Sequence, residues 1–393
     1  MEVDILNIPK LRFKDTNGND YPQWEKKLIK DILKIYHGKD YKNEPNEKKL
    51  YPVLGTGGII TYIDKFLCDW ECVLIGRKGT INKPQYMKTP FWSVDTLFYS
   101  KPKLKQNPKF QYYLFQNINW KIYDESTGVP SLSASTIEHI NRFIPTYTEQ
   151  EKIASFFSTI DKKIENLANT ITSLENQKKG LLQQIFSQKL RFKDKNGNNY
   201  PNWEKKKLGK LLSITSSKRV HEADWTTSGI PFYRARDIVS IFNNKPISKI
   251  YISEKLYEEC SSSCGKISEN DLLVTGVGTI GIPYLVKKSD KFYFKDGNII
   301  WLKNSPAIYG KYLFYIFISS YVQKQINMMT GKGTVGTYTI KNAKDTNILL
   351  PCLEEQTKIA DFLSAFDRKL DNQKAQLEHW QQIKKGLLQQ MFV

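Results

Sequence analysis

Residues 148–186 read TEQEKIASFFSTIDKKIENLANTITSLENQKKGLLQQIF, a stretch that predicts one long helix. Thr148 followed by Glu151 resembles the capping box that begins a helix. Apolar residues then recur at alternating spacings of four and three, interrupted only by Lys178, and this seam is typical of a coiled coil. The apolar residues of the seam are Ile153, Phe157, Ile160, Ile164, Leu167, Ile171, Leu174, Leu181 and Ile185.

The same pattern returns near the end of the chain. Lys384 stands 206 residues after Lys178, at the same position of the heptad, where a polar residue tends to set register and partner choice. This second seam is less regular, because Gln373 and Trp380 replace aliphatic residues of the first. Its apolar residues are Ile359, Leu363, Phe366, Leu370, Leu377, Leu387 and Met391.

The two helices belong to a repeat that covers the whole chain. The clearest matched segments are residues 11–15 with 190–194, 21–27 with 200–206, and 178–184 with 384–390. The sequence therefore contains two units of about 180 to 205 residues, with nearly identical ends and different middles. We interpret the ends as shared scaffolding or docking elements, and the middles as domains that do the same kind of work on different targets.

The length of the helices favours an antiparallel pair. Each helix would be ~57 Å long, whereas the domain of ~150 residues between them would be only ~30 Å across. A parallel pair would require the chain to travel back along the full helix. The alternative is two independent amphipathic helices, each packed on its own domain.

The charge of the chain points to a polyanionic partner. Lys and Arg number 59 against 40 Asp and Glu, which gives a net charge of +19, whereas soluble domains commonly carry ~2–8. A lysine-rich proteome could produce the same bias without selection for binding. The 13% aromatic content excludes a disordered chain. The five cysteines are expected to be reduced, and the absence of a long apolar run predicts a soluble, cytoplasmic protein without membrane contact.

The middles, residues 21–147 and 200–353, contain short β-like runs separated by turn signals, which predict two compact α+β domains. Three glycine-rich or arginine-containing clusters in them could face DNA, since glycine lets backbone approach phosphates and Arg, Lys and Thr reach base edges. An ordinary turn, or an arginine paired with Asp237, is the alternative. The candidate DNA-binding residues are Arg77, Lys78, Thr80, Arg234, Arg236, Thr275, Thr279, Lys332 and Thr334.

Motifs for catalysis and metal binding are missing from the sequence. It has no complete phosphate-binding P-loop, and none of its 16 prolines is adjacent to another, as the Asn/Asp-Pro-Pro-aromatic pocket of an N-methyltransferase requires. The pair Cys68 and Cys72 does not align with Cys260 and Cys264 in the repeat, so we expect no metal site. A self-contained nuclease or methyltransferase and a coiled-coil adaptor remain as alternative functions.

The order of these elements resembles the specificity subunit of Type I restriction-modification systems. The resemblance rests on a motif before each helix: Ile144-Pro145 with Glu149-Gln150-Glu151-Lys152-Ile153-Ala154, and Leu350-Pro351 with Glu355-Gln356-Thr357-Lys358-Ile359-Ala360. It implies a non-catalytic subunit whose two target-recognition domains each read one half of a bipartite DNA site. It also implies helices that space these domains and dock two modification subunits, which bind S-adenosylmethionine and methylate adenine. The resemblance further implies that restriction subunits, which hydrolyse ATP with Mg²⁺, join the complex and that this chain itself binds no cofactor.

We therefore expect an α+β fold with two target-recognition domains in a pseudo-twofold repeat, separated by two long antiparallel coiled-coil helices. The expected parts are a segment at 1–20 that completes the cyclic repeat, a first target-recognition domain at 21–147, a central helix at 148–188, a second target-recognition domain at 189–353, and a C-terminal helix at 354–393.

Deleting one heptad from the first helix is expected to change the number of unread base pairs between the two half-sites, because in this interpretation the helix sets their spacing. Genome-wide mapping of methylated sites in cells that carry the shortened chain measures the gap. An unchanged gap would show that the helix does not set it.

Overall fold

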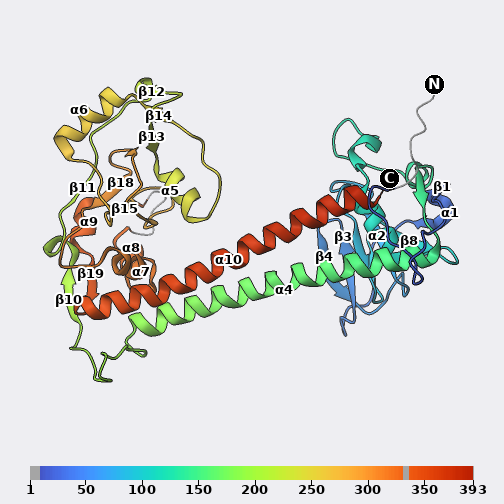
Figure 1. Cartoon of the computed structure of the whole chain (residues 1–393), viewed down its shortest axis with the longest axis horizontal. Helices are drawn as coiled ribbons and strands as arrows, with labels where there is room; N and C mark the ends of the chain where they lie inside the picture. The colour runs from blue at the N-terminus through green and yellow to red at the C-terminus, as the bar shows by residue number, and fades with distance from the viewer. Residues whose placement is uncertain (1–8, 331–335, 393) are drawn as a thin grey trace. The chain divides into compact units, whose positions relative to one another are not determined.

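The computed structural model describes residues 9–330 and 336–392 (Figure 1). The chain divides into two compact units: unit 1 comprises Met1–Asn169 with Lys374–Val393, and unit 2 comprises Thr170–Gln373. The two long helices, α4 (Tyr147–Phe186) and α10 (Leu353–Met391), each contribute one part to each unit. The expected pair of long helices is therefore present, and both units mix helix and sheet.

Unit 1 is built on two small sheets and a short strand pair. The four-stranded sheet has the order β2-β8-β5-β6, from Leu33–Tyr36, Leu97–Pro102, Cys72–Gly76 and Gln85–Met87. The three-stranded sheet has the order β4-β3-β7, from Gly58–Ile63, Tyr51–Gly55 and Trp92–Ser93. Strands β1 (Glu25–Leu28) and β9 (Asn141–Ile144) pair antiparallel. The helices are α1 (Ile29–Ile32), α2 (Pro108–Asn117), the 3₁₀ turn Trp120–Tyr123 and α3 (Ala134–Glu138).

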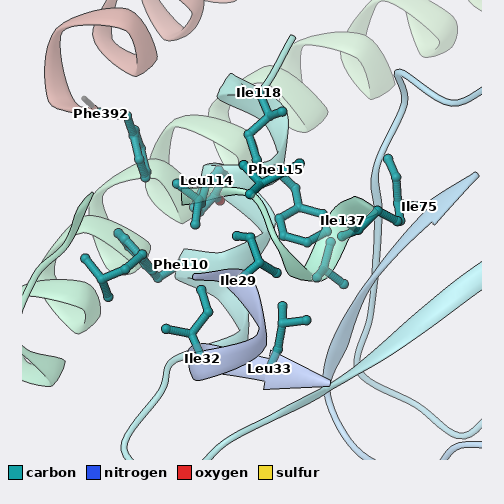
Figure 2. Close-up of a cluster of buried hydrophobic side chains, with 14 of the residues drawn as sticks. Ile29, Ile32, Leu33, Ile75, Phe110, Leu114, Phe115, Ile118, Ile137 and Phe392 are labelled. Carbon is teal, nitrogen blue, oxygen red and sulfur yellow. The ribbon is translucent and has the colours of Figure 1, made fainter. Parts of the chain in front are cut away.

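Helix α2 forms the centre of the unit 1 core. Asn107 caps it by accepting a hydrogen bond from the backbone N–H of Phe110, and Pro108 occupies a first-turn position where no N–H is needed. Its buried face packs on α1 and on Phe392, whose ring stacks on Phe110 at 5.4 Å between centroids (Figure 2). Phe392 also contacts Phe157 of α4, so in unit 1 the end of α10 runs against the beginning of α4.

Unit 2 repeats this plan with additional helices. One four-stranded sheet has the order β11-β18-β15-β16, from Ile214–Thr215, Ile299–Leu302, Leu272–Thr275 and Pro283–Leu285. The other has the order β12-β14-β13-β17, from Trp225–Thr226, Tyr251–Ile252, Ile230–Tyr233 and Tyr293–Phe294. The strand pair is β10 (Glu204–Lys207) with β19 (Asn347–Leu350). The helices are the 3₁₀ turns Leu208–Lys210 and Glu222–Asp224, α5 (Ala235–Phe242), α6 (Glu254–Cys264), α7 (Gly310–Ile318), α8 (Ser320–Thr330) and α9 (Ile340–Asp345).

Each unit contains the same buried ionic cluster. In unit 1 the carboxylate of Glu149, which is fully buried, accepts two hydrogen bonds from Arg12 at 2.9 and 2.7 Å and one from the indole N–H of Trp24 at 3.1 Å. In unit 2, Glu355 accepts the equivalent bonds from Arg191 and Trp203. These contacts explain why the ends of the two repeats are nearly identical in sequence.

A second repeated cluster explains the lysine in each helix seam. In unit 1, Lys384 lies 2.6 Å from Asp161, which also accepts a 2.7 Å hydrogen bond from the hydroxyl of Tyr113 on α2. In unit 2, Lys178 pairs with Asp367, which accepts a hydrogen bond from Tyr315 on α7. Burial, together with these hydrogen bonds, raises the pKa of both tyrosines, which therefore act as donors. The lysines thus join α4, α10 and the globular part of each unit.

The two lysine pairs join the late part of one long helix to the early part of the other, so the helices run antiparallel in each unit, and none of the remaining seam residues is exposed. Eleven are buried: Ile153, Phe157, Ile160, Leu167, Ile171, Leu174, Ile185, Ile359, Leu363, Leu370 and Met391. Five are half-buried: Ile164, Leu181, Phe366, Leu377 and Leu387.

Replacing Glu149 with Ala is expected to destabilise unit 1 by about 3–5 kcal/mol, because it leaves the Arg12 guanidinium without its buried counter-ion. Native-state hydrogen exchange of the full chain measures this, with the amides of unit 2 as the internal reference. The double variant with Arg12→Ala should lose less than the sum of the two single variants. Additivity within about 0.5 kcal/mol would contradict a coupled pair.

Candidate nucleic-acid interface

A tight loop follows the buried strand β5 in unit 1 and contains Arg77 and Lys78. Gly76 begins it, and a Cβ there would clash with the backbone oxygen of Thr80; Gly79 adopts a φ of +87°, which favours glycine. The loop is fixed from outside, because the carbonyl of Arg77 accepts a 2.9 Å hydrogen bond from the N–H of Leu132. The sequence thus forms a rigid loop that carries two cationic side chains.

Unit 2 contains the equivalent loop after β15. A Cβ on Gly276 would lie 2.7 Å from the carbonyl oxygen of Tyr338, so only glycine fits. The backbone N–H of Tyr338 donates a 2.8 Å hydrogen bond to the carbonyl of Gly276. Gly278 has a φ of +68°. Thr275 is fully buried, donates to the carbonyl of Thr279 at 2.6 Å and accepts from a backbone N–H. Thr275 therefore closes the loop, and Thr279 is the exposed member of the pair.

The loop of unit 2 lines one side of a groove of about 840 Å³, and α5 lines the other. Arg234, at the start of α5, donates two hydrogen bonds to Asp237 at 2.7 and 2.9 Å, and its guanidinium lies 5.8 Å from the ring of Trp225. These partners occupy Arg234, whereas Arg236 is exposed. The groove also contains Thr279, so three candidates from two distant segments meet here.

Other polar groups in this groove were not identified from the sequence. Among the described residues, the indole N–H of Trp225 is buried without a hydrogen-bond partner, and it belongs to the groove lining. Lys295 and Asn298 also line the groove. Of these residues, only Asn298 could have been suspected from the sequence, because it directly follows the turn signal Asp296-Gly297. Amide, indole and ammonium groups together can offer hydrogen bonds to base edges and phosphates.

Unit 1 has a smaller cavity, of about 420 Å³, at the corresponding loop. Arg77 and Lys78 line it with His37, and Arg77 donates to the carbonyl of Asp95 at 3.3 Å. The other lining residues include Glu125 and residues 131–135, which come after Asp124 in the sequence. Hydrogen bonds from the backbone N–H groups of Ser131 and Ser126 lower the pKa of Asp124 and hold this segment in place. The cavity wall is thereby ordered, and two cations remain available to an anionic partner.

The nine candidate residues thus separate into distinct groups. Arg77 and Lys78 meet in unit 1, and Arg234, Arg236 and Thr279 meet in unit 2. Thr80 belongs to the unit 1 loop, where its carbonyl abuts Gly76, and Thr275 is buried. Lys332 and Thr334 lie outside the described residues.

Two further features concern metals and membranes. Across residues 9–330 and 336–392, no three or more His, Cys, Asp and Glu side chains gather in a way that could hold a metal ion. Cys68 and Cys72 are buried free thiols 3.8 Å apart. Within the same residues, no helix combines the length and the apolar character that crossing a membrane requires.

Several known proteins that resemble this chain belong to one kind of subunit. A model of the Type I restriction modification DNA specificity domain matches residues 21–176 and again residues 200–379. The MjaVIII and MjaIX type I restriction enzyme specificity subunits of Methanocaldococcus jannaschii are 24% and 26% identical, each over 96% of this chain and 94% of the relative. The crystal structure of a Type I S subunit from M. genitalium superposes with a TM-score of 0.64 at 18% identity, over 98% of this chain and 99% of that one.

Replacing Arg77 with Ala is expected to lower discrimination at one base pair by about 1–3 kcal/mol, the range for a bidentate arginine contact to a base edge. Lys78→Ala should instead weaken binding to all sequences alike and reduce the salt dependence by about one phosphate contact. Binding of duplexes at several salt concentrations distinguishes the two effects. Lys105→Ala, an exposed lysine outside the cavity, is the matched control, and an Arg77 variant that behaves like it would remove Arg77 from the interface.

Proposed function

Because this chain belongs to the Type I restriction modification DNA specificity family and contains the family's domain twice, we propose that each unit reads one half of a bipartite double-stranded DNA site. The observation that carries this proposal is a tight loop that requires two glycines. It recurs after β5 and β15, each time at the edge of a polar cavity. A rigid loop loses little conformational entropy on binding, which favours recognition of a fixed pattern of base edges.

The charge of the chain supports a DNA partner. A net charge of +19 supplies the salt-dependent attraction to phosphates that brings a protein to DNA of any sequence. We assign sequence discrimination to Arg77 in unit 1 and to Arg236 with Thr279 in unit 2. Arg234 acts as a positioning residue, because its bonds to Asp237 hold the first turn of α5.

The two half-sites are proposed to differ in sequence. In unit 2 the helix α5 stands between strands β13 and β14, whereas in unit 1 the equivalent strands β3 and β4 are joined by a short turn at Thr56-Gly57. The wall that faces the common loop therefore has a different shape and chemistry in each unit. Different walls favour an asymmetric recognition sequence.

Catalysis is assigned to partner subunits. We propose that two modification subunits, which bind S-adenosylmethionine and methylate adenine, dock on the long helices, and that restriction subunits with ATP and Mg²⁺ join them. The seam residues of α4 and α10 are buried or half-buried, so the exposed faces of these helices supply the docking surface. The helices are further proposed to set the gap between the half-sites.

Co-production of the full chain with its modification subunits is expected to methylate adenines within one bipartite, asymmetric sequence. Genome-wide mapping of methylated adenines identifies that sequence, and Arg77→Ala should relax one half of it while Arg236→Ala relaxes the other. The control is the chain alone with S-adenosylmethionine or Mg²⁺, which should neither methylate nor cleave DNA. Activity of the chain alone, or relaxation of the same half by both variants, would contradict the proposal.

A further inference from the structure

An apolar hairpin in unit 1 exposes two adjacent isoleucines. Ile59 and Ile60 on β4 are 56% and 53% exposed. Successive side chains of a regular strand point to opposite faces, but here the pairing with β3 shifts, so that Leu54 opposes Ile59 and Val53 opposes Thr61. This β-bulge leaves Ile60 as the extra residue, and bulges re-aim side chains near functional sites. β4 is also an edge strand.

The hairpin lies directly against the loop proposed to read DNA. A Cβ on Gly76 would be 3.2 Å from the methyl group of Thr56, at the hairpin turn, and a Cβ on Gly79 would be 4.0 Å from the Thr56 hydroxyl. Gln85 strengthens this junction by donating to the carbonyl of Gly55 at 2.9 Å. The hairpin turn and the loop with Arg77 therefore form one continuous surface.

The side chain of Ile60 packs over Gly55. Its Cδ1 atom lies 2.8 Å from the position that a Cβ of Gly55 would occupy, so the glycine provides the space in which Ile60 rests. Contiguous exposed apolar side chains that are rimmed by polar residues mark interaction sites. Because the turn of this hairpin meets the loop that carries the cations Arg77 and Lys78, the partner that fits this surface is DNA.

Isoleucine can recognise one feature of a base pair. Its side chain has no hydrogen-bonding atom, and the C5-methyl group of thymine is the apolar group that base pairs present in the major groove. We propose that Ile59 and Ile60 contact thymine methyl groups in the half-site read by unit 1. This inference rests on the proposed function, and it names the bases that this half-site must contain. In unit 2 the helix α5, with the exposed Arg236, stands between the equivalent strands β13 and β14, so the contact made by isoleucine belongs to unit 1.

Replacing thymine with uracil removes the methyl group and leaves base pairing unchanged. The full chain, assembled with its modification subunits, is expected to bind the natural duplex about fourfold more tightly than a duplex in which one contacted thymine of the unit 1 half-site is uracil, which corresponds to burial of one methyl group. Any effect of uracil in the other half-site should be independent of Ile59 and Ile60. The half-site of unit 1 is the one that Arg77→Ala relaxes.

The double variant Ile59→Ser/Ile60→Ser should bind both duplexes equally, while its salt dependence stays that of the wild type. Leu104→Ser, which removes a 91% exposed apolar side chain elsewhere in unit 1, is the matched control and should keep the fourfold preference. No preference in the wild type, or a preference that persists in the double variant, would overturn this inference. A double variant that loses the modification subunits yet keeps the methyl preference would also overturn it and identify the hairpin as a protein contact.

These outcomes are distinct from failure of the proposed function. Sequence-specific binding without a methyl effect overturns the inference alone. Absence of sequence-specific binding by the wild-type assembly would overturn both.

Discussion

A carboxylate buried at the first turn of each long helix is the constraint on which the rest of the structure depends. Glu149 and Glu355 have no exposed surface, and moving an ion out of water costs several kcal/mol unless an opposite charge and hydrogen bonds compensate it in place. Arg12 and Arg191 provide this compensation from segments 137 and 164 residues away. Each unit must therefore bring the start of its repeat to the start of its long helix, whatever lies between them.

Much of this architecture could be predicted from the sequence, because it depends on periodicity and repetition. The seam from Ile153 to Ile185 and its second copy give the long helices, and the repeated Lys178 and Lys384 mark the polar position in each. The sequence did not reveal their partners, Asp367 and Asp161, since a contact between positions far apart in the chain leaves no periodic signal. The family resemblance and the expected α+β fold are confirmed.

The candidate interface was less predictable, because a turn motif does not show which side chains face outward. Thr275 and Thr279 stand in the same glycine-rich cluster, yet one closes the loop from inside and the other is exposed. Ile59 and Ile60 resemble an ordinary buried strand in the sequence, yet both are exposed on the edge strand β4, whose pairing with β3 shifts register. The same scaffold thus supports unlike surfaces in the two units, because the loop is fixed by backbone contacts that leave the facing wall free to vary.

The place of Phe392 has a consequence for the order in which the chain acquires its structure during synthesis. The ribosome delivers all of unit 2 (Thr170–Gln373) before the last turns of α10 emerge, whereas the unit 1 core lacks Phe392 until then. The first 169 residues of the chain therefore keep apolar surface uncovered until the rest of the chain has been translated. At 5–20 residues per second this interval is roughly 10–45 s. Nascent chains of this protein therefore have a long interval in which part of the unit 1 core lacks its C-terminal packing partner.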